Sequence, residues 1–367
     1  MRKQTFKFSK SATDIFFDLS ITKLKEIVDV KKVIFITDEN IFTQHQKKFK
    51  GFNTIVLKPG EAFKLQSTID SIILQLLEFE ADRSSILVGV GGGVVTDITG
   101  FAASIYLRGI QFGFIPTSLL AMVDASIGGK NGINIELYKN IIGVTKQPSF
   151  ILYDISFLHT LPESEWQNGF AEIIKHACIK DAAMFKLLQA NSLKYYQSKK
   201  KELITLIERN AKIKLKVVQA DEFEKAERKL LNFGHTLGHA LENLYELSHG
   251  QAISIGMNYA SEISEQLLGF KQNDAVNSLL QQYGLPTNVS YNKRKVFEIL
   301  KMDKKKAVDQ RIVSSIFRMH INRMPSDVEI IDLLKSTDKL SQNEFLTEKE
   351  ARVCDLCGTF GHKKAPN

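Results

Sequence analysis

Short apolar runs alternate with amphipathic helical patterns over residues 1–160 of the chain. Each run ends in polar or glycine-rich turn residues, which is typical of a buried parallel strand whose carboxyl end meets a loop. Strands are expected within 33–40, 53–61 and 85–93, and helices at 65–80 and 96–106. A strand and a short helix are expected within 111–124, and an edge strand with a short helix within 1–30. This alternation predicts a doubly wound parallel sheet, in which ligands bind at the carboxyl ends of the strands.

The pattern becomes almost purely helical from Leu161 onward. We therefore predict an α/β fold with a Rossmann-like parallel-sheet domain over 1–160 and a mostly α-helical domain over 161–335. The polar segment 336–367 is expected to form a loosely ordered tail.

The stretch 228–242 separates polar from apolar residues if it forms one helix. Arg228, Asn232, His235 and His239 then share one face, at i, i+4, i+7 and i+11. Surface helices usually fill such a face with Lys and Glu, whereas these side chains bind anions, metal ions and protons. The alternative is a surface helix whose two histidines are hydrogen-bonded and hold no ligand.

The composition narrows the class of protein. A chain of 367 residues with 44% hydrophobic and 25% charged residues is typical of a globular protein with two domains. It has no apolar run of membrane-spanning length, no signal-peptide pattern and three cysteines, so we expect a cytoplasmic protein. The net charge of +8 fits nucleic acid, a membrane surface or an anionic small molecule. Because the basic residues are dispersed and not interleaved with aromatics, we favour the small molecule and expect neither nucleic acid nor membrane as partner.

A glycine cluster at 89–100, between an expected strand and helix, predicts a phosphate-binding cradle. Backbone N–H groups and the positive end of a helix dipole attract phosphate there, and glycine allows a close approach. The cluster is not a strict GxGxxG motif, so a tight structural turn is the alternative. Asp38, Asn40, Glu61 and Lys64 stand at the ends of two earlier strands, where a carboxylate can bind a ribose hydroxyl.

Glu172, His235 and His249 are the candidate metal ligands. Zinc accepts imidazole nitrogen and carboxylate oxygen, and a catalytic site combines three such ligands with an open position. His249 opens the sequence HGQAISIGM, which indicates a loop entering a helix. His235 and His239 have the spacing of HExxH without its glutamate, which disfavours a zinc protease. For each residue alone, the alternative is a buried, hydrogen-bonded side chain.

Basic and amide side chains form a candidate anion-binding set: Arg108, Lys130, Lys139, Asn140, Lys175, Lys214, Arg228 and either Lys304 or Lys305. Two of the lysines belong to a glycine-laced loop expected over 124–140, and loops of this kind at the open end of a sheet bind phosphate. For any single lysine, a solvated surface charge is the alternative.

Together these stretches resemble the 3-dehydroquinate synthases of the sugar-phosphate cyclase superfamily. The resemblance extends over residues 35–310 and rests on motifs that are specific in combination. They are PGEAFK (59–64), GGGVVTDITGFAASIYLRGI (91–110), PTSLLAMVDASIGGKNGIN (116–134), FLHTLP (157–162), NGFAEIIKH (168–176), LNFGHTLGHALE (231–242) and HGQAISIGM (249–257).

The resemblance implies two cofactors and a homodimer in which Arg108 reaches toward the partner's site. One cofactor is a divalent cation, Zn²⁺ or alternatively Co²⁺, on Glu172, His235 and His249. The other is NAD, regenerated in each turnover. Its implied contacts are Asp38, Asn40, Glu61, Lys64, Gly92, Gly93, Val94, Asp97, Thr117, Ser118, Lys139, Phe157 and Thr160.

The implied substrate is 3-deoxy-D-arabino-heptulosonate 7-phosphate, which carries a phosphate and a carboxylate. The reaction is a transient oxidation by NAD, phosphate elimination, reduction and aldol closure to 3-dehydroquinate, a step toward the aromatic amino acids. Glu224 and His239 match the acid–base positions of the family. The implied substrate contacts are Arg108, Asp124, Lys130, Asn140, Asn168, Lys175, Lys214, Arg228, Asn232, His239 and a lysine of the DKK at 303–305, for which we choose Lys304.

The chain departs from the family pattern at several positions. Asn131 stands where threonine is usual, and Ala226 and Glu227 replace Gly and Leu. Related cyclases act on sedoheptulose 7-phosphate or glucose 6-phosphate, which lack the carboxylate that the Arg228 position is thought to hold. Arg228 therefore favours the heptulosonate. The sequence also leaves open a metal-dependent polyol dehydrogenase and a nucleic-acid-binding protein.

The tail sequence CDLCGTFGH lies outside the family pattern. Its Cys354, Cys357 and His362 are one ligand short of a structural zinc set. A disordered tail is therefore favoured over a second metal site.

Overall fold

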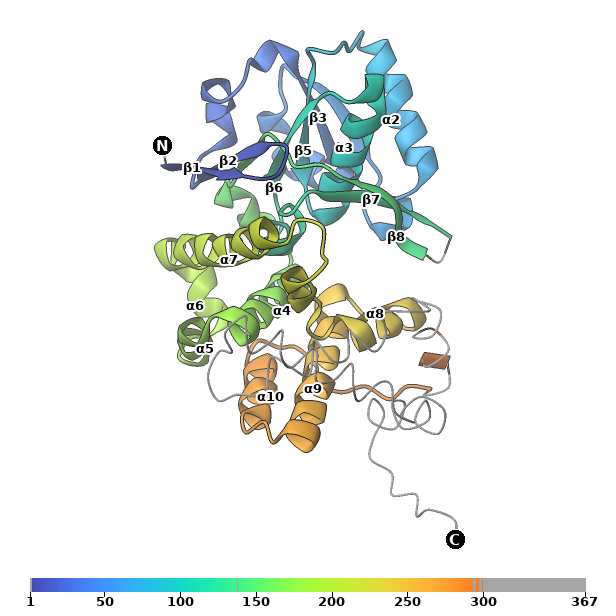
Figure 1. The fold of residues 1–367 in the computed structure, drawn as a ribbon. Coiled ribbons are helices and arrows are strands. Elements are labelled where there is room, and N and C mark those ends of the chain that lie inside the picture. The colour runs from blue at the N-terminus through green and yellow to red at the C-terminus, as the bar shows by residue number, and fades with distance from the viewer. Residues whose placement is uncertain (1, 137, 293–294, 297–298, 300–367) are drawn as a thin grey trace. The chain divides into compact units, whose positions relative to one another are not determined.

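The structure is a computed structural model that describes residues 2–136, 138–292, 295–296 and 299. The chain divides into two compact units (Figure 1). Unit 1 comprises Met1–Gly169 with Tyr196–Phe223, and unit 2 comprises Phe170–Tyr195 with Glu224–Asn367. The sequence pattern places a boundary between residues 160 and 161, and the contacts add Tyr196–Phe223 to unit 1. The domain limits of 1–160, 161–335 and 336–367 stay a prediction.

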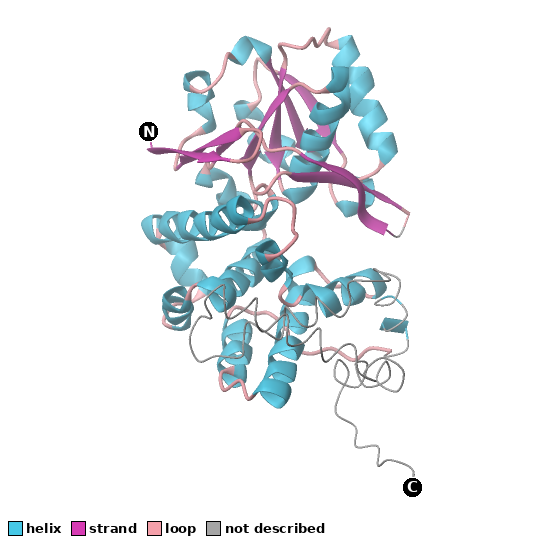
Figure 2. Ribbon diagram, viewed as in Figure 1, coloured by secondary structure: helices cyan, strands magenta, loops and turns pink. Residues whose placement is uncertain are grey.

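In the described part of unit 1, seven strands form one sheet (Figure 2). Its order is β1-β2-β9-β6-β5-β3-β4, and neighbours are parallel except for the β1–β2 hairpin at one edge. The strands are β1 (Arg2–Lys7), β2 (Ala12–Phe17), β3 (Val33–Asp38), β4 (Asn53–Leu57), β5 (Ile86–Gly91), β6 (Gln111–Pro116) and β9 (Phe150–Leu152). The parallel sheet predicted from the sequence is confirmed, although the pattern does not reveal β2 or the three-residue β9.

Helices and a separate hairpin complete unit 1. The α-helices are α1 (Glu39–His45), α2 (Gln66–Glu78), α3 (Gly93–Ile105) and α7 (Lys200–Ala220), while α4 (Glu163–Lys180) begins in this unit and α6 (Leu193–Ser198) ends in it. The 3₁₀ turns are η1 (Ile21–Glu26), η2 (Val30–Lys32), η3 (Gln46–Lys48), η4 (Glu61–Phe63), η5 (Tyr106–Arg108) and η7 (Ile155–Thr160), and η6 (Ala121–Ala125) is a π turn.

The region 124–140 is not the glycine-laced loop expected from the sequence. Most of it folds into an antiparallel hairpin of β7 (Lys130–Ile135) and β8 (Tyr138–Thr145). Its glycines serve the pairing of the strands, because a Cβ on Gly132 would lie 2.6 Å from Ile142 O. Glycine inside a strand often marks a site where another backbone approaches closely.

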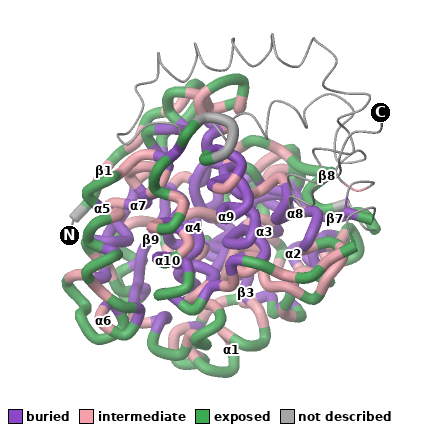
Figure 3. The backbone as a smooth tube through the Cα atoms, turned by 90° about the horizontal axis from the view of Figure 1, so that it is seen from below, coloured by how far each residue is buried: buried purple, intermediate pink, exposed green. Residues whose placement is uncertain are grey.

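Apolar residues on both faces bury the central strands. Figure 3 shows in purple which segments of the chain are buried. Every residue of β5 is buried. On one face Phe35, Val88, Ile115 and Leu152 belong to a continuous core. On the other face α3 packs closely, and a Cβ on Gly89 would lie 2.7 Å from Thr99 Oγ1. Small residues thus bring the start of α3 to the carboxyl end of β5, where the cradle is expected.

In the described part of unit 2 the regular elements are helices. They are the second part of α4, then α5 (Ala182–Gln189), the start of α6, η8 (Glu227–Asn232), α8 (His235–Leu244), α9 (His249–Leu268) and α10 (Asn273–Gln282). The helical pattern predicted after Leu161 is therefore confirmed for this part of the chain. Among the described residues, no helix combines the length and the apolar character that crossing a membrane requires.

The stretch 228–242 is not the single helix that its periodicity predicts. A 3₁₀ turn, η8, ends at Asn232, and α8 starts at His235 after Gly234 with a φ of +78°. Glycine adopts this left-handed conformation at little cost, whereas a continuous helix excludes it. Arg228 and Asn232 therefore belong to a different element from His235 and His239.

Candidate active site

Glycine positions bring the predicted metal ligands together in unit 2. The break at Gly234 makes His235 the first residue of α8. A Cβ on Gly256 would lie 1.9 Å from Gly234 O, so α9 meets the break at backbone distance. Ser248 forms a capping box, which makes His249 the first residue of α9, as the sequence predicts. The third ligand, Glu172, is fully buried on α4.

One carboxylate and two imidazoles converge on a common point. Glu172 Oε1 lies 3.5 Å from His235 Nε2 and 3.2 Å from His249 Nε2. One ligand atom from each of these residues lies within 4.8 Å of the others. Zinc binds such atoms at about 2.0–2.2 Å, so donors at this spacing can share one ion after small movements. The donor set and its burial fit a divalent cation of the zinc type.

The neutral state of the His235 ring suits a metal ligand. Burial lowers the pKa of His235 well below the usual 6.5, and the Lys175 charge lowers it further, so the ring is neutral. His235 Nδ1 lies 3.1 Å from Phe233 O and can donate a hydrogen bond to it. In that tautomer the lone pair of Nε2 lies on the side of Glu172. Burial also lowers the pKa of His249, but contacts with Glu172 and Glu242 outweigh this effect and raise it to about 9.

Two basic residues expected to bind substrate are buried in the same unit. Lys175, 1% exposed, forms an ion pair with Glu172 one turn earlier on α4. Arg228 is 3% exposed on η8. A buried charge is expensive unless it is paired, and Lys175 has such a partner.

Of the two expected acid–base residues, His239 lies near the metal ligands and Glu224 lies beside Asn232. The ring centroid of His239 lies 5.1 Å from that of His235 and 6.5 Å from that of His249. Glu224 has a φ of +58°, and its Oε1 accepts a hydrogen bond of 2.8 Å from Asn232 Nδ2. Unit 2 thus brings His239 to the metal ligands and Glu224 to the expected substrate residue Asn232.

The glycine cluster forms the predicted cradle in unit 1. Gly92 is the N-cap of α3, so the N–H groups of Gly93 and Val94 lie in its first turn, where no helical acceptor exists. A Cβ on Gly93 would lie 3.0 Å from Ala125 Cβ, and one on Gly91 2.5 Å from Val95 Cβ. Side chains would crowd this strand-to-helix turn, and their absence exposes its backbone donors. The cradle fits a dinucleotide phosphate.

Three residues expected to bind NAD are connected beside the glycine cluster through Asn134 and the expected substrate residue Asn140. Lys64, 3% exposed, donates from Nζ to Asp97 Oδ2 at 2.5 Å and also to Asn140 Oδ1. Burial raises the pKa of Asp97, and the Lys64 charge opposes that rise. Asn134 Nδ2 donates to Glu61 Oε1 at 2.8 Å, and Asn134 Oδ1 accepts from Asn140 N at 2.8 Å.

The other expected NAD residues lie at strand ends, in turns or in the first turn of α1 in unit 1. Asp38 caps α1 by accepting from Ile41 N at 3.0 Å, and burial raises its pKa. Thr117 and Ser118 follow β6 and are buried. Exposure differs among the rest: Asn40, Lys139 and Thr160 are exposed, and Phe157 is buried.

Substrate residues predicted in unit 1 fall into a paired group and an exposed group. Lys214 on α7 donates to Asp124 Oδ2 at 2.8 Å, and buried Asn168 donates to Glu165 Oε1 at 3.1 Å. Arg108 and Lys130 are exposed, and Arg108 has a φ of +65°. Two further expectations lie outside the described residues: Lys304 with its neighbour Lys305, and the tail residues Cys354, Cys357 and His362.

Sequence reasoning missed one polar side chain in each unit. Glu242 Oε2 lies 3.8 Å from His249 Nδ1, and Asn134 links Glu61 to Asn140. Asn134 interrupts the apolar run GINI, which is a detectable signal. Glu242 lies seven residues after His235 on α8 and carries no such signal.

Two family models and several known proteins match the chain. Residues 54–168 match the model described as 3-dehydroquinate synthase N-terminal, and residues 169–306 match the one described as 3-dehydroquinate synthase C-terminal. A curated 3-dehydroquinate synthase from Thermodesulfovibrio yellowstonii is 41% identical over 315 residues, covering 83% of this chain and 87% of that protein. The similarity therefore includes both units.

Solved cyclase structures share the fold. A 2-deoxy-scyllo-inosose synthase, complexed with carbaglucose-6-phosphate, NAD⁺ and Co²⁺, is 25% identical with a TM-score of 0.74 and covers 83% of this chain and 88% of its own. A 2-epi-5-epi-valiolone synthase from Streptomyces hygroscopicus, with NAD⁺ and Zn²⁺ bound, is also 25% identical with a TM-score of 0.74, covering 93% and 100%. The α/β fold class expected from the sequence is confirmed.

Proposed function

Because the chain belongs to the 3-dehydroquinate synthase family, we propose that it converts 3-deoxy-D-arabino-heptulosonate 7-phosphate into 3-dehydroquinate and inorganic phosphate. The match to a curated 3-dehydroquinate synthase over most of the chain carries this proposal. It is an enzyme of the lyase class that closes a carbocycle. The cyclases for other sugar phosphates are less similar, at 25% identity, and the buried Arg228 supports a substrate with a carboxylate.

NAD is the proposed redox cofactor, bound by unit 1. The exposed backbone donors at the start of α3 support this assignment, as does the Lys64–Asp97 pair beside them. In our proposal Asp38 and Glu61 contact hydroxyl groups of NAD. The remaining NAD residues expected from the sequence, including Lys139, belong to the same proposal.

A divalent cation is proposed on Glu172, His235 and His249. Such an ion, when bound, polarises a substrate oxygen and stabilises the charge that develops there. The protein contributes the fixed donor positions: α4 provides the carboxylate, and the first residues of α8 and α9 provide the imidazoles. The Phe233 carbonyl orients the His235 ring through Nδ1.

The neighbouring side chains of unit 2 have separate proposed roles. Arg228 and Asn232 bind the substrate carboxylate, and Lys175 adds positive charge next to the anionic substrate. His239 and Glu224 take up and return the proton of the hydroxyl that is oxidised. Elimination then removes a proton from the carbon next to the new ketone while phosphate leaves, and positioning is the main task of the protein.

For the residues of unit 1 we propose contacts with the substrate phosphate. Arg108, Lys130, Asn140 and Lys214 provide positive charge and hydrogen-bond donors for the phosphate, with Asp124 orienting Lys214 and Asn168 adding an amide. Lys304, which lies outside the described residues, is also proposed to contact the substrate. We also propose a cytoplasmic homodimer in which Arg108 reaches the partner's site. Sedimentation velocity can test whether the protein is a dimer.

The decisive experiment separates the cyclase from a dehydrogenase and from cyclases for other sugars. Purified enzyme with NAD and Zn²⁺ should release phosphate from the heptulosonate phosphate without accumulating NADH. NADH formed in proportion to substrate would contradict a cyclase and indicate a polyol dehydrogenase. A parallel assay with sedoheptulose 7-phosphate and glucose 6-phosphate should give little phosphate. Faster release from either sugar would overturn the proposed substrate.

A further inference from the structure

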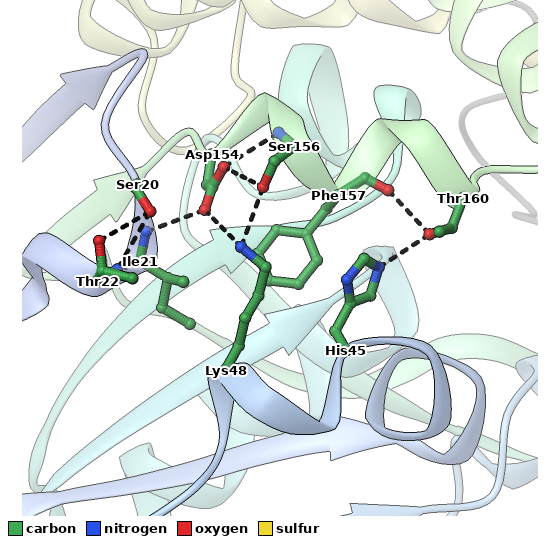
Figure 4. A network of polar contacts seen from close by, with 9 residues as sticks. All are labelled: Ser20, Ile21, Thr22, His45, Lys48, Asp154, Ser156, Phe157 and Thr160. Carbon is green, nitrogen blue, oxygen red and sulfur yellow. Dashed lines mark hydrogen bonds and ion pairs between the residues drawn. The ribbon is translucent and has the colours of Figure 1, made fainter.

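The end of α1 and the turn η3 are joined to η7 by two side chains, His45 and Lys48 (Figure 4). His45 is the last residue of α1, and Lys48 is the last residue of η3. Both side chains reach across to η7, more than a hundred residues later in the sequence. The figure shows His45 beside Thr160 and Lys48 extended past Phe157.

His45 contacts η7 through both its ring nitrogen and its ring face. His45 Nε2 lies 2.9 Å from Thr160 Oγ1, and Thr160 Oγ1 donates its proton to Phe157 O at 3.2 Å. A hydroxyl has one proton, so His45 Nε2–H must be the donor in the first bond. Burial and then the Lys48 charge lower the pKa of His45, so the donor is the neutral ring. The ring also packs edge-on against Phe157, with 4.8 Å between centroids.

Lys48 holds the start of the same turn. Its Nζ lies 3.2 Å from Asp154 Oδ2 and 3.0 Å from Ser156 Oγ. Asp154 is the N-cap of η7 and accepts from Ser156 N at 3.0 Å. The ammonium also lies 4.7 Å from the Phe157 ring centroid. Lys48 thus fixes the first residues of η7, and His45 fixes the last.

Both ends of this connection carry residues assigned to NAD. Asp38 caps α1 and Asn40 lies in its first turn, while Phe157 and Thr160 belong to η7. We infer that His45 and Lys48 are positioning residues for the dinucleotide, because they fix η7 relative to the helix that carries Asp38 and Asn40. This inference rests on the proposed NAD-dependent function. It assigns no contact with the sugar phosphate to either side chain.

A purely structural connection would behave differently from a positioning one. Loss of a structural contact lowers the melting temperature without selecting between ligands. Loss of a positioning contact weakens NAD binding and leaves the KM for the sugar phosphate and the kcat at saturating NAD nearly unchanged. The NAD dissociation constant and the split between the two KM values therefore discriminate the two roles.

Paired substitutions make the test sharp. His45→Phe retains a ring against Phe157 and removes the donor, whereas His45→Gln retains a donor near the position of Nε2. Lys48→Met retains the aliphatic stem and removes the charge. The exposed neighbours Gln44 and Lys47 provide matched controls, as Gln44→Ala and Lys47→Met. NAD binding to the full-length, zinc-loaded protein is measured by calorimetry, followed by steady-state kinetics.

We expect His45→Phe and Lys48→Met to weaken NAD binding about three- to tenfold, the size of one net hydrogen bond. His45→Gln and both controls should stay within about twofold of the wild type, the expected scatter of such measurements. If wild-type protein binds NAD and neither His45→Phe nor Lys48→Met weakens it, the inference is wrong and the proposed function stands. An equal rise in the KM for the sugar phosphate would also overturn it. If wild-type protein fails to bind NAD, both the inference and the proposed function fail.

Discussion

A Cβ on Gly100 would lie 2.0 Å from Asn131 Oδ1. Helix α3 can therefore pack against the β7–β8 hairpin at this point only because Gly100 has no side chain. Asn131 is 4% exposed, and its Nδ2 donates to Gly129 O at 2.8 Å and to Lys146 O at 2.9 Å. The amide therefore cannot turn away without losing both of these hydrogen bonds. Asn131 holds the backbone next to Lys130 and fills the space above Gly100.

Gly100→Ala should destabilise the protein, although alanine normally favours a helix over glycine by about 1 kcal/mol. Overpacking costs about 1–3 kcal/mol, and the lost amide bonds add about 1 kcal/mol each, so the net effect is unfavourable. In an Asn131→Ala background the same change should be nearly neutral, because the amide is gone. Urea unfolding of the four proteins in a double-mutant cycle gives the coupling. Equal costs in the two backgrounds would show that Gly100 and Asn131 do not interact.

The two histidines of α8 should differ in their effect on metal content. His235→Ala removes one of the three ligands, so bound zinc should fall from about one per chain to about none, and activity should be lost with it. His239→Ala should keep the zinc and lower kcat by about 100-fold or more, as expected for a general acid–base residue. Elemental analysis of the dialysed proteins measures the metal, and circular dichroism checks the fold.

His159→Ala is the matched control, because His159 is exposed and lies in unit 1. It should keep both the zinc and the catalytic rate. Equal zinc loss in His235→Ala and His239→Ala would contradict the division of roles between these residues.

Local sequence signals were sufficient for the parallel sheet and for the strand-to-helix turn at the glycine cluster. The apolar runs that become β3 and β5 are buried along nearly their whole length, whereas β4 buries Ile55 and Leu57. The glycines after β5 open the start of α3. Periodicity failed at Gly234, because a spacing of 3.6 residues cannot reveal a single left-handed residue. The prediction of His235 as a ligand does not depend on a continuous helix, because the break makes His235 the first residue of α8.

Pairings that depend on distant parts of the chain could not be predicted from the sequence. The hairpin formed by β7 and β8 requires Gly132 opposite Gly143, and β9 is too short to stand out from its surroundings. The association of α7 with unit 1 depends on contacts such as Lys214 with Asp124, 90 residues apart. Only the fold brings such pairs together.

Glu227, which departs from the family pattern, has an ion-pair partner in Lys180 at the end of α4. The pair holds η8, which carries Arg228, against the helix that carries Glu172. Both side chains are just over one-fifth exposed, so the pair should contribute less than about 1 kcal/mol to stability. Lys180→Ala and Glu227→Gln should instead raise the KM for the sugar phosphate by about three- to tenfold, because Arg228 loses its fixed position.

The charge-swapped protein Lys180→Glu/Glu227→Lys should recover most of the wild-type KM. Glu246→Gln, at an exposed position, is the control and should leave the KM unchanged. Steady-state kinetics at saturating NAD measure the effect. An unchanged KM in both single variants would show that the pair does not position Arg228.

Asp154 should make the stability of the protein dependent on pH in the acidic range. Burial alone would raise the pKa of Asp154, but hydrogen bonds from Ser156 and Ile21 and the charge of Lys48 outweigh it and hold the pKa below the usual 3.8. A lowered pKa means that the unfolded state binds the proton more readily. The contribution of Asp154 is therefore fully present above pH 3.8 and is lost as the pH falls through the lower folded pKa.

We expect Asp154→Asn to destabilise the protein by about 1–3 kcal/mol at pH 7, with a difference from wild type that shrinks below pH 3.8. Urea unfolding at a series of pH values measures this difference, and Asp70→Asn, at an exposed position, is the control. A difference that stays constant down to the lowest pH at which the protein folds would contradict a charged Asp154 as the source of the stabilisation.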